Sequence, residues 1–506
     1  MRISAAVLLM ALPAAAPAED PLSAIGWLRQ APPRDLPGTV LLEPPVSKTA
    51  LNPEIEVTPL EELASAIGLV PPEVTGLPLD VWQGSEPDRL ARAIAEVPVQ
   101  DSPAMQTLLY TLLLSETRPP PGPDAAEALL LARIDRLIKL GATDPAQALV
   151  QLAGPTDSAA RFRRWFDATL LTGDEDRSCA ALTAAPYLAP DYAATIFCTA
   201  RRGDWQTAAL TLEAAHSLAL LSPQMLALLD RFLSPDVFEG APPLPAPADP
   251  DPLTFRLFET IGERLPTAHL PRAFATADLR DVAGWKAQIE AAERLTRVGA
   301  LSPNLLLGLY SDRRPAASGG VWDRAAAIQR FETALDTGSA DAVAKTLPDA
   351  WAAMRAAGLE VAFAELFADR LAGQQLDGPA AGLAWRIRLL SPAYEDAART
   401  PPDDTAASAF LAALAQGDPG RVRAPDDRAR AIAAGFAPDA APPPELRDTI
   451  AGGALGAAIL RAMSLFDSGA RGNPADLSAA LATFRAVGLE DTARRAALQL
   501  MLLERD

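Results

Sequence analysis

The sequence repeats one local arrangement, in which a helical segment ends at a glycine and a second helical segment follows at once. A basic residue lies two or three positions before each of these glycines, which are Gly141, Gly299, Gly358 and Gly488. Glycine readily adopts the left-handed conformation that closes a helix, and a cation in the last turn interacts favourably with the helix dipole. The pattern therefore predicts a series of αα-hairpins.

Apolar residues recur at helical spacing along most of the chain. A clear example is the row Trp285, Ile289, Ala292, Leu295 and Val298. Alternating patterns typical of strands occur only at residues 38–43 and 54–60. Because the intervals between the hairpins are unequal, we predict an all-α fold built as a degenerate αα-hairpin solenoid in two or more blocks.

Proline-rich segments divide the chain, which has 506 residues and 48 prolines. Proline stiffens a segment and interrupts helices, so such segments are typical of linkers. The predicted divisions are a signal peptide (1–18), a Pro-rich and partly extended N-terminal module (19–118), a helical-repeat block (124–238), a linker (239–252) and a second helical-repeat block (253–506).

The N-terminus has the features of an export signal. Arg2 precedes an apolar stretch at residues 3–12, and the small residues Ala16 and Ala18 predict cleavage before Glu19. No later segment offers the ~20 uncharged apolar residues that a transmembrane helix needs. We therefore expect a soluble periplasmic protein. Its net charge of −19 disfavours binding to nucleic acid.

The chain has two cysteines, Cys179 and Cys198. If a helix ends near Tyr187 and the next begins near Asp191, the two thiols stand about level on facing helices, at ~1.5 Å per residue. Oxidising compartments favour disulfides. We therefore predict a structural disulfide between these cysteines.

The stretch "GDWQTAALTLEAA" resembles the second helix of a tetratricopeptide repeat. In that family a glycine ends the first helix, an aromatic residue fills a groove, and small residues lie where neighbouring helices touch. The positions that match this repeat-packing pattern are Gly203, Trp205, Ala208, Leu212 and Ala215. The resemblance implies a tetratricopeptide-like helical repeat. We expect Asp204 to act as a helix cap.

A broader resemblance covers most of the chain after residue 18. The segments "GLVPPEVTGLPLDVW", "PAASGGVWDRAAA" and "GLEDTARRAALQ" are similar to those of uncharacterised Ala/Pro-rich exported bacterial proteins, some labelled antifreeze proteins. This resemblance implies no activity. Ice binding would require an evenly repeated array of threonines or similar residues, and the sequence has no such repeat.

No established catalytic pattern stands out. The two histidines, His216 and His269, are too few to form a zinc site alone, and no nucleophile elbow or P-loop is present. We predict no catalytic, cofactor-binding or metal-binding residues and no cofactor.

Two functions fit these features. The first is a non-catalytic periplasmic helical-repeat protein that binds another protein or an envelope component through a long surface. The alternative is a cell-envelope hydrolase with a carboxylate-based site. A deep pocket with two convergent carboxylates would favour the enzyme, and an apolar groove would favour the binding protein.

Overall fold

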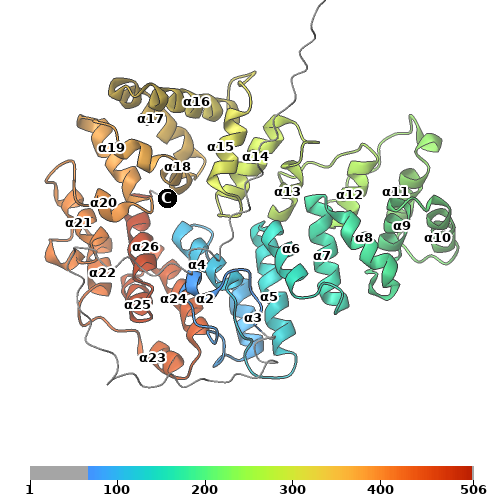
Figure 1. Cartoon of the computed structure of the whole chain (residues 1–506), viewed down its shortest axis with the longest axis horizontal. Helices are drawn as coiled ribbons and strands as arrows, with labels where there is room; N and C mark the ends of the chain where they lie inside the picture. Colours follow the sequence, from blue (N-terminus) through green and yellow to red (C-terminus); the bar gives the residue numbers. More distant parts are fainter. Residues whose placement is uncertain (1–65, 504–506) are drawn as a thin grey trace, which may run out of the picture. The chain divides into compact units, whose positions relative to one another are not determined.

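The computed structural model describes residues 66–503, and these residues confirm the predicted all-α class (Figure 1). Helices account for 66% of the described residues, which contain 25 α-helices and no strand. The strand-like patterns at 38–43 and 54–60 and the predicted signal peptide lie outside the described residues.

The helices follow one another closely along the chain. The first group comprises α2 (Pro72–Thr75), α3 (Pro87–Glu96), α4 (Pro103–Leu114), α5 (Ala125–Leu140), α6 (Thr143–Leu152), α7 (Ala159–Thr172), α8 (Glu175–Ala184), η3 (Pro186–Leu188), α9 (Tyr192–Arg201), α10 (Trp205–Ser217), α11 (Pro223–Leu233) and η4 (Pro235–Phe238). The second group comprises α12 (Pro252–Thr260), η5 (Arg272–Phe274), α13 (Ala275–Asp278), α14 (Trp285–Thr296), α15 (Pro303–Ser311), α16 (Val321–Thr337), α17 (Ala340–Ala356) and α18 (Glu360–Ala372). The third comprises α19 (Gly378–Leu389), α20 (Tyr394–Ala397), α21 (Ala406–Ala415), η6 (Pro419–Arg421), α22 (Asp427–Gly435), α23 (Pro444–Ala451), α24 (Leu455–Ala470), α25 (Pro474–Ala486) and α26 (Glu490–Leu502).

The four predicted helix-closing glycines all have left-handed backbone conformations. Gly141, Gly299, Gly358 and Gly488 have φ angles of 86°, 70°, 66° and 85°. They follow α5, α14, α17 and α25, and the next helix begins within a few residues of each. The helix–glycine–helix pattern is therefore confirmed, whereas a solenoid arrangement of the hairpins stays a prediction.

Arginines connect neighbouring helices by donating hydrogen bonds to the carbonyl oxygens at helix ends. Arg133 of α5 is fully enclosed and donates to the carbonyl oxygens of Leu113 and Ser115 at the end of α4. Arg297 donates to the carbonyl oxygen of Ala357, just after α17. These carbonyls have no partner within their own helices, so the arginines satisfy groups that would otherwise be costly to bury.

The predicted linker at 239–252 contains no helix before α12 begins, and the helices on its two sides are in contact. Helix α12 packs against α7 and α11. Arg256 of α12 forms an ion pair of 2.7 Å with Glu175 of α8, whose side chain is completely buried. The backbone N–H of Leu244 donates to Glu263 at 2.8 Å. The division into blocks stays a prediction, but packing and charge pairing cross this segment.

The early and late helices also contact one another. Helix α4 packs against α26, where the side chain of Gln499 accepts a 2.8 Å hydrogen bond from the backbone N–H of Ala104. Gly456 of α24 contacts the ring of Trp82 so closely that a β-carbon on this glycine would lie 2.3 Å from the ring. The close approach therefore requires glycine at this position.

Candidate interaction surface

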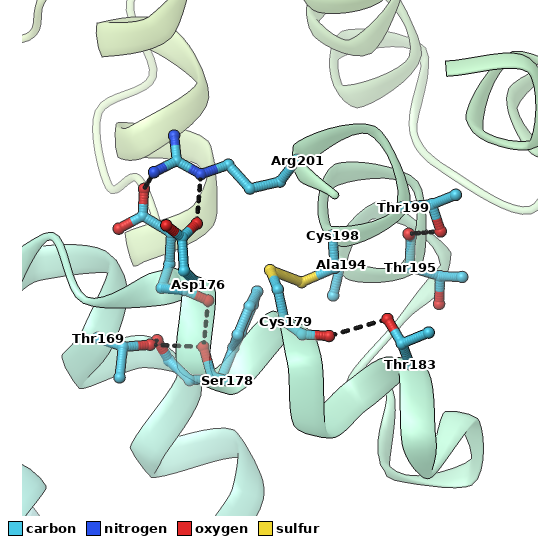
Figure 2. The surroundings of a disulfide bond; sticks show 12 residues. Thr169, Asp176, Ser178, Cys179, Thr183, Ala194, Thr195, Cys198, Thr199 and Arg201 are labelled. Atoms are coloured by element: carbon cyan, nitrogen blue, oxygen red, sulfur yellow. Dashed lines mark hydrogen bonds and ion pairs between the residues drawn. A yellow bond between two sulfur atoms is a disulfide. The ribbon is translucent and has the colours of Figure 1, made fainter. Parts of the chain in front are cut away.

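The predicted disulfide between Cys179 and Cys198 is present and joins α8 to α9 (Figure 2). The two Cα atoms lie 4.8 Å apart, within the range that a disulfide spans. Helix α8 ends at Ala184, and α9 begins at Tyr192 after the short helix η3. The hairpin therefore places the cysteines level with each other, as the sequence predicted.

Charge pairing joins the same two helices. Arg201 of α9 donates to Asp176 at 2.9 Å and lies 3.2 Å from the carboxylate of Glu175, both on α8 (Figure 2). The carboxylate of Glu175 also forms an ion pair with Arg256 of α12. One buried carboxylate thus connects α8, α9 and α12. Together with the disulfide, it holds the α8–α9 hairpin in a fixed arrangement next to the helices that follow.

The residues matched to the tetratricopeptide-like pattern lie at the α9–α10 turn and along α10. Gly203 has a φ of 90°, and Asp204 caps α10 by accepting from the backbone N–H of Thr207 at 3.1 Å, as expected. The inward side of α10 is formed by Ala208, Leu212 and Ala215, which are all buried. The small alanines let α10 approach α9 and α11 closely. These contacts fit helix packing, and the repeat type stays a prediction.

Trp205 has an unusual position for a packing residue. Half of its surface, 50%, is exposed, and its ring lies 5.9 Å from that of Phe232 on α11. One side of the indole is therefore packed and the other faces solvent.

Helix α10 also carries apolar residues on its outward side, beside exposed polar residues such as Glu213 and Ser217. Leu210, Ala214 and Leu218 recur at intervals of four residues and are all exposed, Leu210 by 72% and Leu218 by 68%. We call this row the α10 outer face. A helix on a protein surface normally places charged or polar residues on its outward side. The spacing of these residues is visible in the sequence, but their exposure depends on α10 having no further helix packed on that side.

The exposed apolar residues concentrate around this helix. Seven of the twelve large hydrophobic side chains that are exposed in the described part of the chain lie between residues 187 and 237. They are Tyr187, Tyr192, Trp205, Leu210, Leu218, Leu220 and Val237. Tyrosine and tryptophan are enriched in protein–protein interfaces, and concentrated exposed apolar surface marks such sites.

The two histidines lie apart from any catalytic arrangement. The Nε2 atom of His216 lies 3.0 Å from Asp230, between α10 and α11, and His269 is exposed in the segment after α12. Among residues 66–503, no group of three or more histidine, cysteine, aspartate or glutamate side chains is placed to hold a metal ion. None of the helices in this range is both long and apolar enough to cross a membrane.

The carboxyl group of Asp167 on α7 has a strongly raised pKa. Burial raises its pKa to about 7, although Arg163 opposes the shift, and the charges of Asp251 and Asp191 add to it. The carboxyl group is therefore partly protonated near neutral pH.

A cavity of about 530 Å³ bears on the carboxylate alternative, and we call it the α4 cavity. It lies between α4, the α14–α15 turn, the start of α18 and α26. Two carboxylates, Glu360 and Glu365, are among its lining residues. Burial raises the pKa of Glu365 while Arg495, 4.0 Å away, lowers it. Glu360 is buried and also has an interaction partner. The rest of the lining is mainly apolar.

No family model matches the chain, and neither the curated proteins nor the solved structures contain a match.

Proposed function

We propose that the protein is exported to the periplasm and acts there as a non-catalytic binding protein, capturing a helical segment of another protein on the α10 outer face. The observation that carries this proposal is the row Leu210, Ala214 and Leu218 on the outward side of α10. The disulfide supports export, because such bonds persist in oxidising compartments.

The chemistry of the face favours a helix as the occupant. Residues four positions apart form a ridge along a helix, and a partner helix packs its own ridges into the grooves beside it. Ala214, between the two leucines, leaves room for close approach. On the opposite side of α10, Ala208, Leu212 and Ala215 already pack in this way within the chain. Trp205, half exposed at the start of the helix, is the residue type that most often anchors such interfaces.

The test compares two double variants that add the same charge. Leu210→Glu with Leu218→Glu alters the α10 outer face, whereas Val282→Glu with Leu305→Glu alters two other exposed apolar residues. Tagged mature protein is recovered from periplasm and the co-purifying proteins are quantified by mass spectrometry. We expect a partner that is retained by the wild type and by the control, and is depleted at least about tenfold by the α10 variant, since charges in an apolar interface are costly.

Equal recovery of every partner by the two variants would contradict the proposal. Hydrolysis of cell-wall glycan by the purified wild type, lost on Glu365→Gln, would instead support the carboxylate-based hydrolase.

A further inference from the structure

Three arginines lie at or near the α4 cavity, and no carboxylate forms an ion pair with any of them among residues 66–503. They are Arg297, which lines the cavity, and Arg272 and Arg294, which are not among its lining residues; we call the three the arginine cluster. Their charges act on one another: burial lowers the pKa of Arg294, and the charges of Arg272 and Arg297 lower it further, while the charge of Asp278 opposes the shift. Burial likewise lowers the pKa of Arg272, and the charge of Arg297 adds to the effect.

Several other partly buried arginines of the chain are paired with carboxylates. Glu259 pairs with Arg256 and, at 2.6 Å, with Arg280. Glu293 pairs with Arg324 at 2.5 Å. The three arginines of the cluster have no such ion pair, and neighbouring like charges cost free energy unless an anion joins them.

The members of the cluster differ in how their donors are used. Arg294 donates to the carbonyl oxygens of Thr267 and Leu270, and Arg297 uses its Nε to reach the carbonyl oxygen of Ala357. The side chain of Arg272 makes no hydrogen bond or ion pair among the described residues. A guanidinium presents five N–H donors in a planar fork, so donors remain available on Arg272 and Arg297.

Two buried hydroxyl groups next to the cluster also lack partners. The Oη atom of Tyr110 on α4 and the Oγ1 atom of Thr296 at the end of α14 are buried and have no hydrogen-bond partner in the described structure. Thr296 is only 7% exposed, and both residues line the α4 cavity together with Arg297. Unsatisfied buried hydroxyls are rare because each costs about 1–3 kcal/mol, so their presence in a cavity indicates a missing polar partner.

We infer that the α4 cavity binds an organic anion, with its carboxylate or phosphate group held by the lining residues Arg297, Tyr110 and Thr296 and by Arg272, whose stem lies beside Gly141 at the edge of the cavity. Arginine forks match both groups, which accept several charge-assisted hydrogen bonds at once.

The remaining walls define the other part of the ligand. They include Val70, Leu301 and Val361, and the volume of about 530 Å³ lies in the range of small-molecule sites. The two lining carboxylates repel a bound anion less than unpaired carboxylates would. Glu365 lies 4.0 Å from Arg495, and Glu360 has an interaction partner of its own. The ligand is thus an anion with an apolar body, and it occupies a site separate from the α10 outer face.

Calorimetric titration of the purified mature protein with octanoate and with octyl phosphate tests the inference and distinguishes the two anionic groups. Octylamine serves as the cationic control with the same apolar chain. We expect one of the two anions to bind and octylamine not to bind. Arg272→Met should weaken binding at least about tenfold, whereas Arg89→Met, which removes an arginine that is 84% exposed, should leave it unchanged.

A second measurement separates a binding role of Arg272 from a structural one. The stem of Arg272 packs beside Gly141, and methionine preserves that contact. Because Arg272→Met removes a repelled cation that has no partner, it should raise the Tm of the ligand-free protein by about 1–2 °C. A lowered Tm would identify Arg272 as a structural residue and overturn the inference.

Two further outcomes would overturn it. One is the absence of binding by either anion, with the hydroxyls of Tyr110 and Thr296 satisfied by water alone in a high-resolution structure. The other is equal affinity of the anion for the wild type and for Arg272→Met.

Discussion

The α8–α11 hairpins and the α4 cavity are assembled in opposite ways. In the hairpins, the disulfide, the cap at Asp204 and the buried side of α10 all join residues close in the sequence. The cavity brings together α4, α14, α18 and α26, which are spread along the chain from Pro103 to Leu502. The first region exposes apolar surface on a locally stabilised helix, and the second encloses polar groups whose partners are missing. A locally built region suits docking of a protein, whereas an enclosed, long-range site suits a small ligand.

The two sides of α10 offer the largest contrast in stability. Ala208→Glu places a charge on the buried side and should lower the free energy of unfolding by about 3–5 kcal/mol. Leu210→Glu, on the outer face, should change it by less than about 0.5 kcal/mol. Urea denaturation followed by tryptophan fluorescence measures both. Similar losses from the two variants would show that the outer face is packed rather than free.

The disulfide ranks next in expected effect. Replacing Cys179 and Cys198 with alanine should cost about 3 kcal/mol, since the bond restricts an unfolded loop with a sequence separation of 19. The wild type should show no free thiols under denaturing, non-reducing conditions. Two titratable thiols in protein recovered from the periplasm would contradict the bond and its role in holding the α8–α9 hairpin together.

Such local features were the part of the fold that sequence reasoning could predict. The left-handed glycines at 141, 299, 358 and 488 and the Cys179–Cys198 pairing each depend on a few neighbouring residues or one hairpin. The spacing of the residues in the α10 outer face is visible in the sequence. Whether they are exposed depends on what packs against that side of the helix.

The arginine cluster could not be predicted in the same way. Arg297 looked like an ordinary cation near a helix end, and only the fold places it beside Arg272, Tyr110 and the carbonyl of Ala357. A side chain that lacks a partner can be recognised only when all the contacts around it in the fold are known. This is why the sequence indicated a binding protein but no ligand site.

Asp167 on α7 gives a smaller, pH-dependent effect. Its pKa is raised to about 7 in the folded protein, from the ordinary value of 3.8 that we take for the unfolded chain. The unfolded chain therefore releases its proton first as the pH rises, and the folded state loses stability between about pH 4 and pH 7. Above pH 7 the loss is complete.

Asp167→Asn removes this penalty. It should stabilise the protein at pH 8 by about 1–2 kcal/mol and by close to nothing at pH 4, because the side chain is only partly buried. Thermal unfolding across this range measures the difference, with Asp439→Asn, which alters an exposed carboxyl between α22 and α23, as the control. A constant effect of Asp167→Asn at all pH values would show that its carboxyl titrates normally.

The most direct test of the account is photo-crosslinking in living cells from position 210, on the α10 outer face. A photoreactive residue at Leu210 should give one discrete adduct, identified by mass spectrometry as a single partner protein, and Leu218→Glu should abolish it. The same probe at Val282, which is also exposed, should not give that adduct. An identical adduct from both positions, or none from position 210, would contradict capture of a partner by α10.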